Sequence, residues 1–202
     1  MFDGPDGVGK TTQLQQAAKS LVSEGYRVWT TRINGGSTIG EALRTVYLSD
    51  IERPAATDFY IGQAIYEAFV SEIAKQREAY DIILSDRSPL SNVAYQAYGS
   101  GYDKEITLNA CRQTLAALRP ELLLCYTAPL ATLRERLKNA GKGKSDYFES
   151  KPDSFFDNVL QGYQELAQEF PVRTIDATTD TNTIHTQTME LIRPLLTSLP
   201  LS

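Results

Sequence analysis

Short strand-like runs rich in apolar residues alternate along the chain with longer stretches of helical spacing. The short runs predict buried strands, and they are Arg27–Thr31, Ile82–Ser85, Leu122–Tyr126 and Arg173–Ile175. The longer stretches predict amphipathic helices, and they are Lys10–Glu24, Ser37–Leu48, Ala55–Ala79, Asp103–Leu118, Leu130–Asn139, Pro152–Phe170 and Thr183–Leu196. Strands that alternate with helices are typical of a parallel sheet with crossover helices. We therefore expect an α/β fold.

Two segments depart from this alternating pattern. A first strand should precede the glycine-rich segment that begins at Gly4, but only Met1 and Phe2 stand there. Either this strand is very short, or a few native residues are absent before it. Gly141 and Gly143 interrupt a polar stretch, which predicts a loop. We expect one domain over residues 1–202, with a small lid over about 134–151.

Composition and charge narrow the class of protein. A chain of 202 residues with 42% hydrophobic and 22% charged residues is typical of one globular domain. The formal net charge of -5 argues against non-specific binding to nucleic acid or to an anionic membrane. A ligand with phosphate groups must then be bound by a local basic site.

Cysteine usage and the lack of membrane signals favour a reducing compartment. Cys111 and Cys125 have neither CxxC nor metal-site spacing, so we expect buried thiols. No apolar run approaches the ~20 residues that span a bilayer, and the N-terminus lacks the regions of a signal peptide. We expect a cytoplasmic protein.

The segment Gly4–Thr11 fits the phosphate-binding pattern G-x-x-x-x-G-K-[ST] in every required place. Glycines let backbone N–H groups approach phosphate oxygens, and the following helix directs its positive end at the same anion. Lys10 adds a positive charge for the β- and γ-phosphates of ATP, and the hydroxyl of Thr11 is a ligand for Mg²⁺. The residues expected to bind ATP here are Gly4, Gly7, Val8, Gly9, Lys10, Thr11 and Thr12.

Asp6 lies inside this loop, where a carboxylate would be repelled by bound polyphosphate. It either has a task in the acceptor site, such as a hydrogen bond to a sugar hydroxyl, or it forms a turn by bonding its own backbone.

A second candidate site follows the apolar strand that begins at Ile82. Ligands bind at the carboxyl ends of strands in open α/β sheets, and this strand ends in Asp86 and Arg87. Asp86 is therefore placed to meet Mg²⁺, and Arg87 can bind a phosphate with two parallel hydrogen bonds. The alternative is a surface ion pair. Beyond it, helical spacing puts Ser91 with Tyr95, and Asn92 with Gln96, on a face that could lie beside a sugar and base.

Taken together, these segments resemble the sequence pattern of the thymidylate kinases. The likeness covers nearly the chain's whole length: the run Gly4–Gln13, Thr31-Arg32 with Gly35-Gly36-Ser37, Asp86-Arg87 with Ser91-Asn92 and Tyr95-Gln96, and Ile175-Asp176-Ala177. The resemblance implies a P-loop NTPase fold with a five-stranded parallel sheet flanked by helices and a short lid. It also implies that Asp6 approaches the acceptor sugar, that Arg87 binds the acceptor phosphate, and that Asp176 and Ala177 lie near the adenine of ATP. Arg32, Asn92 and Tyr95 would line the acceptor pocket.

The chain departs from the family pattern in the helix predicted at Ala55–Ala79. There the family has a phenylalanine and, four residues later, a base-reading arginine. The usual spacing puts Gly62 and Tyr66 at these places, and a register shifted by about one turn puts Phe59 and Gln63 there. The arginine is absent in both registers, and the glutamine could read a pyrimidine edge.

The family has two branches, which differ in where they place a basic residue near the phosphates. One branch has an arginine inside the P-loop, and this chain has none there. The other has basic residues in the lid, as this chain does at Arg134, Arg136, Lys138, Lys142 and Lys144. Arg134 and Arg136 are expected to contribute most to catalysis, because they lie on a helix. Tyr147 stands where the family's lid motif has an arginine.

The expected activity is transfer of the ATP γ-phosphoryl group to a deoxynucleoside monophosphate, most simply dTMP. Catalysis would rest on positioning and on neutralising charge. One alternative is a deoxynucleoside kinase with Asp3 as general base, and another is a nucleotide-binding module without turnover. The family resemblance also allows the long third helix to pack in a homodimer.

Overall fold

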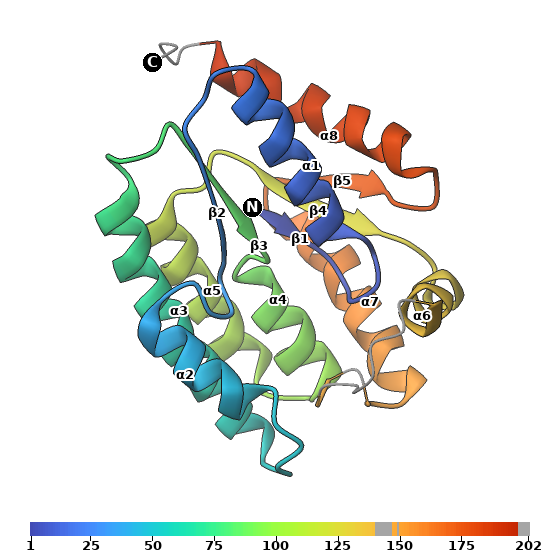
Figure 1. The fold of residues 1–202 in the computed structure, drawn as a ribbon. Helices are drawn as coiled ribbons and strands as arrows, with labels where there is room; N and C mark the ends of the chain where they lie inside the picture. The colour runs from blue at the N-terminus through green and yellow to red at the C-terminus, as the bar shows by residue number, and fades with distance from the viewer. Residues whose placement is uncertain (140–146, 149, 198–202) are drawn as a thin grey trace.

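The computed structural model describes residues 1–139, 147–148 and 150–197. Five parallel strands form one sheet in the order β2-β3-β1-β4-β5 (Figure 1). The strands are β1 (Phe2–Asp3), β2 (Val28–Arg32), β3 (Ile82–Asp86), β4 (Leu123–Thr127) and β5 (Val172–Asp176). The α/β fold with a five-stranded parallel sheet, expected from the sequence, is confirmed.

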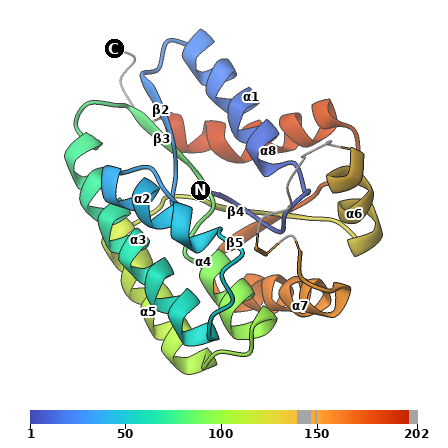
Figure 2. The same cartoon turned by 60° about the horizontal axis from the view of Figure 1, so that its bottom comes forward.

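Helices cover both faces of this sheet. One face bears α1 and α8, and the other bears α3, α5, α7 and the segment α4–η1 (Figures 1 and 2). The helices are α1 (Lys10–Ser23), α2 (Thr38–Tyr47), α3 (Ala55–Gln76), α4 (Leu90–Asn92), the π-helix η1 (Val93–Gly99), α5 (Lys104–Leu118), α6 (Leu130–Asn139), α7 (Asp153–Glu169) and α8 (Thr181–Leu196). None of the described helices is long and apolar enough to cross a membrane.

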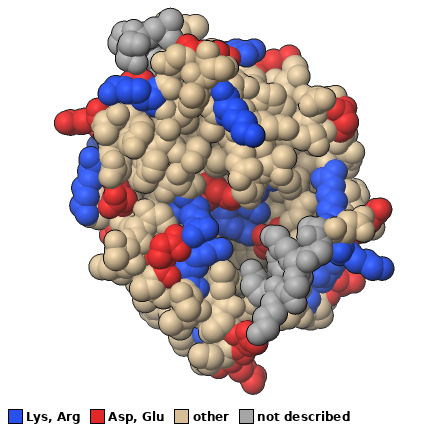
Figure 3. All heavy atoms as spheres, in the orientation of Figure 1, with Lys and Arg blue, Asp and Glu red and all other residues tan. Residues whose placement is uncertain are grey.

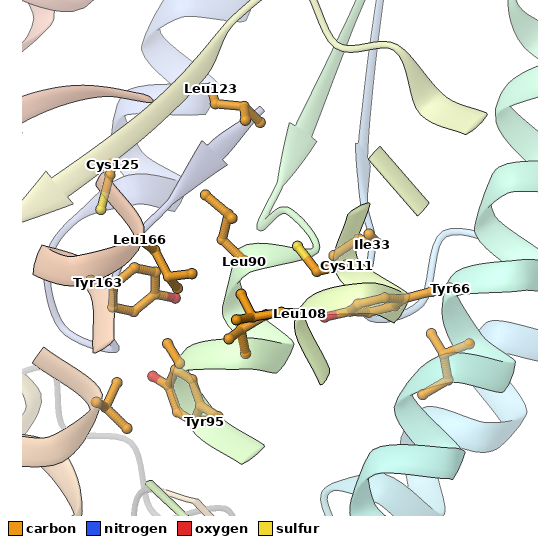
Figure 4. Packing of buried hydrophobic residues seen from close by; sticks show 14 of the residues in the cluster. Ile33, Tyr66, Leu90, Tyr95, Leu108, Cys111, Leu123, Cys125, Tyr163 and Leu166 are labelled. Atoms are coloured by element: carbon orange, nitrogen blue, oxygen red, sulfur yellow. The ribbon is translucent and has the colours of Figure 1, made fainter. Parts of the chain in front are cut away.

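Alternating side chains of the central strands feed two separate cores. On β4, Leu124 and Tyr126 pack with α1 and α8, whereas Leu123 and Cys125 pack on the opposite face. This is the two-residue period of a strand that is buried on both sides. Figure 4 shows part of the second core, in which Leu123 and Cys125 lie with Leu90 and Tyr163.

The short strand β1 holds the centre of the sheet. Phe2 pairs with Asp86 on one side and with Leu124 on the other. Because β1 has two residues, most of β3 extends beyond it, and a cavity of about 430 Å³ lies at the amino ends of β3 and β4. The carboxyl end of β1 leads directly into the glycine-rich loop.

The α4–η1 segment is absent from the helices predicted by apolar spacing. It lies against α7 at very short range, because small residues face aromatic rings at the contact. A Cβ on Gly162 would come within 2.8 Å of the Tyr98 ring, and one on Gly99 within 2.6 Å of the Phe155 ring. The amino terminus of α8 also differs from the prediction, since Asp180 caps the helix through the N–H groups of Asn182 and Thr183.

The expected lid segment is only partly within the described structure. Its incoming side is α6, and Tyr147 and Phe148 are described beyond it. The remaining expected lid residues, 140–146 and 149, lie outside the described residues, and they include Lys142 and Lys144.

Truncation of a core residue on α1 tests the described packing. Leu21 is fully buried in the core shared with α8, so Leu21→Ala should lower the free energy of unfolding by about 2–5 kcal/mol. The adjacent Val22 is 56% exposed, so Val22→Ala should stay within about 0.5 kcal/mol of the wild type. Urea denaturation of the three proteins measures both values, and equal losses would contradict the orientation of α1.

Candidate active site

The loop between β1 and α1 has the backbone geometry of an anion site. Gly4, Gly7 and Gly9 have φ values of 133°, 81° and 94°, a region open mainly to glycine. A Cβ on Gly4 would lie 2.4 Å from the backbone oxygen of Tyr126, so this position must be glycine. No side chain caps the start of α1, which leaves its N–H groups to bind an anion.

A cavity of about 240 Å³ adjoins this loop. It is lined by Asp6, Lys10, Thr11, Arg32, Asn34, Arg44, Tyr47, Leu48, Tyr66, Asp86, Arg87, Ser91, Tyr95 and Phe148. Figure 3 shows a hollow near the middle of one face in which basic side chains gather. Four cations in so small a space, in a protein of net charge -5, indicate a site for an anionic ligand.

Asp6 connects Lys10 with Arg87. Its Oδ1 accepts a short hydrogen bond from Nη2 of Arg87 and lies 3.4 Å from Nζ of Lys10. Its Oδ2 accepts from the hydroxyl of Tyr95 at 2.7 Å. Burial opposes ionisation of this carboxyl, but the charges of Arg87 and Lys10 outweigh it and hold the pKa of Asp6 well below its ordinary value.

Thr11 and Asp86 meet at the ends of α1 and β3. The hydroxyl of Thr11 donates to Oδ2 of Asp86 at 2.5 Å. Both groups offer the oxygen ligands that Mg²⁺ prefers, and Mg²⁺ is commonly bound by one or two protein ligands together with phosphate oxygens and water. Among the described residues no group of three or more acidic, histidine or cysteine side chains could hold a metal ion. The Thr11 and Asp86 oxygens are the protein ligands that such an ion could share with a bound phosphate.

Arg87 has a left-handed backbone with φ of 71°, which costs a non-glycine residue about 1–3 kcal/mol. Its N–H donates to the Phe2 carbonyl at 2.7 Å, and its carbonyl accepts from Oγ of Ser85 at 3.0 Å. Its guanidinium donates to Ser91 at 3.0 Å and lies over the Tyr95 ring. These contacts hold the strained residue in place and direct its side chain into the cavity.

The carboxylate of Asp3 lies directly behind this arginine. It is buried and accepts five hydrogen bonds. They come from N of Gly4 at 2.8 Å, N and Oγ of Ser88 at 3.0 and 2.5 Å, Oγ of Ser91 at 2.5 Å and the hydroxyl of Tyr163 at 2.8 Å. Asp3 thus joins the start of the P-loop, the segment after Arg87 and α7.

Aromatic side chains also line the cavity. Phe148 lies 5.1 Å from Tyr47 and 5.7 Å from Tyr95, measured between ring centroids. The hydroxyl of Tyr47 accepts from Nε2 of Gln96 at 2.9 Å, and burial raises the pKa of this tyrosine. Tyr66 is fully buried beside them.

The two registers considered for the base-reading positions assign residues that lie in different surroundings. Tyr66 lines the cavity, whereas Phe59 stacks on Tyr102 with ring centroids 4.9 Å apart. Gln63 is half-buried and does not line the cavity. Gly62 lies against Asn92, where a Cβ would come within 2.4 Å of Nδ2. Within the described part of the chain, the Asn92 amide is buried without a hydrogen-bond partner.

Five cavity residues were not identified from the sequence: Asn34, Arg44, Tyr47, Leu48 and Phe148. Arg44 donates to the carbonyl of Asn34 at 2.7 Å, and Arg32 pairs with Glu41 at 2.7 Å. The sequence contained a signal for Arg44. Arg44 lies three residues after Glu41 on a predicted helix, so its side chain shares a face with Glu41, the partner of Arg32. Phe148 gave no such signal, because it lies beyond a loop.

The two arginines of α6 have different surroundings. Nη2 of Arg136 donates to the carbonyl of Ala177 at 2.8 Å, and Nη1 lies 3.4 Å from the carbonyl of Val8. Arg136 thus links the P-loop with the loop after β5. Arg134 pairs with Asp153 at 2.6 Å and lies over the Phe156 ring, at the start of α7.

The two remaining predicted positions are exposed. Asp176 accepts from N of Thr178 at 2.9 Å, and hydrogen bonds from Thr178 lower its pKa. Thr12 is exposed on the first turn of α1, beside the loop.

Comparison with known proteins adds independent evidence. A family model described as thymidylate kinase matches residues 2–188. The chain is 32% identical to a thymidylate kinase of Exiguobacterium sibiricum, over 98% of this chain and 93% of that protein. It is 34% identical to one of Dichelobacter nodosus, over 96% and 97% of the two chains. A crystal structure of thymidylate kinase from Ehrlichia chaffeensis superposes with a TM-score of 0.71 at 24% identity, covering 95% of this chain and 96% of that one; at this identity the likeness concerns the fold alone.

The low pKa of Asp6 predicts how stability depends on pH. A carboxyl with a depressed folded-state pKa contributes stability above the unfolded value of about 3.9, and this is lost as pH falls toward the folded value. Asp6→Asn should therefore be less stable than the wild type from pH 5 to pH 7, and the difference should shrink below about pH 4.

Urea denaturation at several pH values measures this difference. Asp157→Asn on α7 is the control, because Asp157 is exposed and such surface changes stay within about 0.5 kcal/mol. A stability difference between Asp6→Asn and the wild type that stays constant down to pH 3 would contradict the ion-pair assignment.

Proposed function

The chain belongs to the thymidylate kinase family, and we propose that it transfers the γ-phosphoryl group of ATP to a deoxynucleoside monophosphate, with dTMP as the preferred acceptor and dTDP as the product. The observation that supports this most directly is the placement of Asp6 between Lys10 and Arg87. One carboxylate thereby brings a donor-site cation and an acceptor-site cation together at the mouth of one cavity. Such an arrangement suits a reaction between two phosphate groups.

On the donor side, the P-loop would bind the phosphates of ATP through its N–H groups and Lys10. The loop at Asp176 and Ala177 would lie near the adenine, and Arg136 fixes that loop relative to Val8. Thr11 and Asp86 are the side chains that would hold Mg²⁺. When bound, the metal ion would neutralise charge on the ATP phosphates.

On the acceptor side, Arg87 would bind the nucleotide phosphate in a bidentate fashion. Arg44 and Arg32 line the same cavity and would add positive charge. Tyr95 bonds to Asp6 and contacts Phe148, so it would lie beside the sugar. Tyr66, at the position of the family's base-reading arginine in one register, would lie at the base end.

The reaction needs no strong general base, because the attacking phosphate oxygen is already anionic. Catalysis would therefore consist of alignment and of stabilising the charge that spreads over the transferred group. Arg136 is better placed for this than Arg134, since it already contacts the P-loop, whereas Arg134 is paired with Asp153. Closure of the lid would exclude water from the reacting groups.

The surroundings of Asp3 argue against the alternative of a deoxynucleoside kinase. That reaction would need Asp3 to take a proton from a neutral hydroxyl. Its two oxygens already accept five hydrogen bonds in a buried position, so no lone pair is directed at the cavity. A homodimer through α3 and a cytoplasmic location stay predictions from the sequence.

An acceptor panel tests the proposed reaction. With ATP and Mg²⁺, dTMP should be phosphorylated fastest among dTMP, dUMP, dCMP, dAMP and dGMP, and thymidine should give no product. A coupled ADP assay with product separation measures each rate. Faster turnover of thymidine than of dTMP would favour the deoxynucleoside kinase, and tight ATP binding without any transfer would favour a binding module.

Replacement of the acceptor arginine tests which phosphate it binds. Arg87→Lys keeps the charge but loses the bidentate geometry. The KM for dTMP should rise about tenfold or more, equivalent to ~1.4 kcal/mol, while the KM for ATP changes little. Arg173→Lys on β5 is the matched control, because Arg173 is exposed and lies outside the cavity. An effect of Arg87→Lys on ATP alone would assign this arginine to the donor site.

A further inference from the structure

The hydrogen bonds around Asp3 favour one orientation for the hydroxyls of the network. A serine or tyrosine hydroxyl has one hydrogen to donate. Burial and the nearby Asp3 carboxylate raise the pKa of Tyr163 well above its ordinary value, so this hydroxyl keeps its proton. The hydroxyl oxygens of Ser91 and Tyr163 also lie 2.9 Å apart, where either could donate to the other. When both donate to Asp3 instead, the lone pairs of Ser91 remain free to accept Nη1 of Arg87, 3.0 Å away.

Asp3 also holds the backbone that follows the strained residue. Ser88 donates to Oδ2 of Asp3 through both its N–H and its hydroxyl. The N–H of Arg87 itself is bound to Phe2, the residue before Asp3. The left-handed turn at Arg87 is thus bound on both sides by two consecutive residues of β1.

The donor loop starts at the same point. Oδ1 of Asp3 accepts from the N–H of Gly4, the first residue of the P-loop. A single buried carboxylate therefore has contacts with the loop expected to bind ATP and with the turn that presents Arg87. Any shift of this carboxylate would change the spacing between the two phosphate sites.

We propose that Asp3 is a positioning residue for the acceptor-site arginine: it binds Ser88 and Ser91 from the end of β1 and so sets where Arg87 presents its guanidinium. Tyr163 on α7 supports this arrangement by donating to the same carboxylate. The inference rests on the proposed phosphoryl transfer to a nucleotide, and it assigns Asp3 no contact with either substrate.

Three variants test this role. Asp3→Asn places an amide among donors, so kcat/KM for dTMP should fall about 10–100-fold while the KM for ATP stays within about threefold. Ser91→Ala removes the acceptor for Nη1 and should act in the same direction. Tyr163→Phe removes one donor without changing the ring, and should lower kcat/KM for dTMP about threefold to tenfold.

Tyr126→Phe is the matched control for Tyr163→Phe. Tyr126 is equally buried, and its hydroxyl lies 2.9 Å from that of Thr188 on the opposite face of the sheet. Both variants should lower the melting temperature, but only Tyr163→Phe should change the kinetics with dTMP. Equal kinetic effects of the two variants would overturn the proposal, and this comparison holds even if Asp3→Asn does not fold.

A double-mutant cycle separates positioning from general support of the fold. If Tyr163 acts through Arg87, adding Tyr163→Phe to Arg87→Lys should cause little further loss of kcat/KM for dTMP. Fully additive losses would contradict the proposal. A wild-type protein that phosphorylates no nucleotide would refute the proposed function instead, so the two failures are distinguishable.

Discussion

The pairing of Phe2 with Asp86 is the contact on which the arrangement of the site depends. Parallel strands end at the same edge of a sheet, so this register brings the first glycine of the P-loop beside the turn at Arg87. The Arg87 N–H donates to the Phe2 carbonyl at 2.7 Å, which continues the pairing one step beyond the strand. A shift by one residue would turn Asp86 away from Thr11 and would separate Arg87 from Asp6.

Asp6 explains how a cavity with four cations exists in the folded chain. Lys10 and Arg87 would repel each other across a small, partly dry space, and repulsion between like charges grows as water is excluded. The carboxylate between them offsets this repulsion without occupying the whole cavity. The same geometry makes Asp6 sensitive to any anion that enters, because an incoming phosphate would compete with it for both cations.

The parts of the site that lie in continuous segments could be predicted from the sequence. The P-loop, Asp86 and Arg87 each follow a strand directly, so local pattern and the topology of parallel sheets place them together. Arg44 and Phe148 reach the cavity through the packing of α2 and of the expected lid segment, which no local pattern determines. Asp3 was visible only as a carboxylate before the loop, and its role changes once Ser88, Ser91 and Tyr163 are seen to surround it.

The close approach of Gly4 to Tyr126 has a consequence for how this sequence can vary. The atom that a Cβ on Gly4 would meet is a backbone oxygen, at 2.4 Å, so no change of side chain elsewhere can make room for it. At Gly162 the obstacle is the ring of Tyr98, and a smaller residue at 98 would relieve an alanine there. A second substitution could therefore compensate for alanine at Gly162, in the core, but not for alanine at Gly4, in the loop, although a Cβ would clash at both positions. A glycine of this chain can therefore be replaced during evolution where its neighbour is a side chain, which a second substitution can change. It cannot be replaced where its neighbour is the backbone, which every residue has.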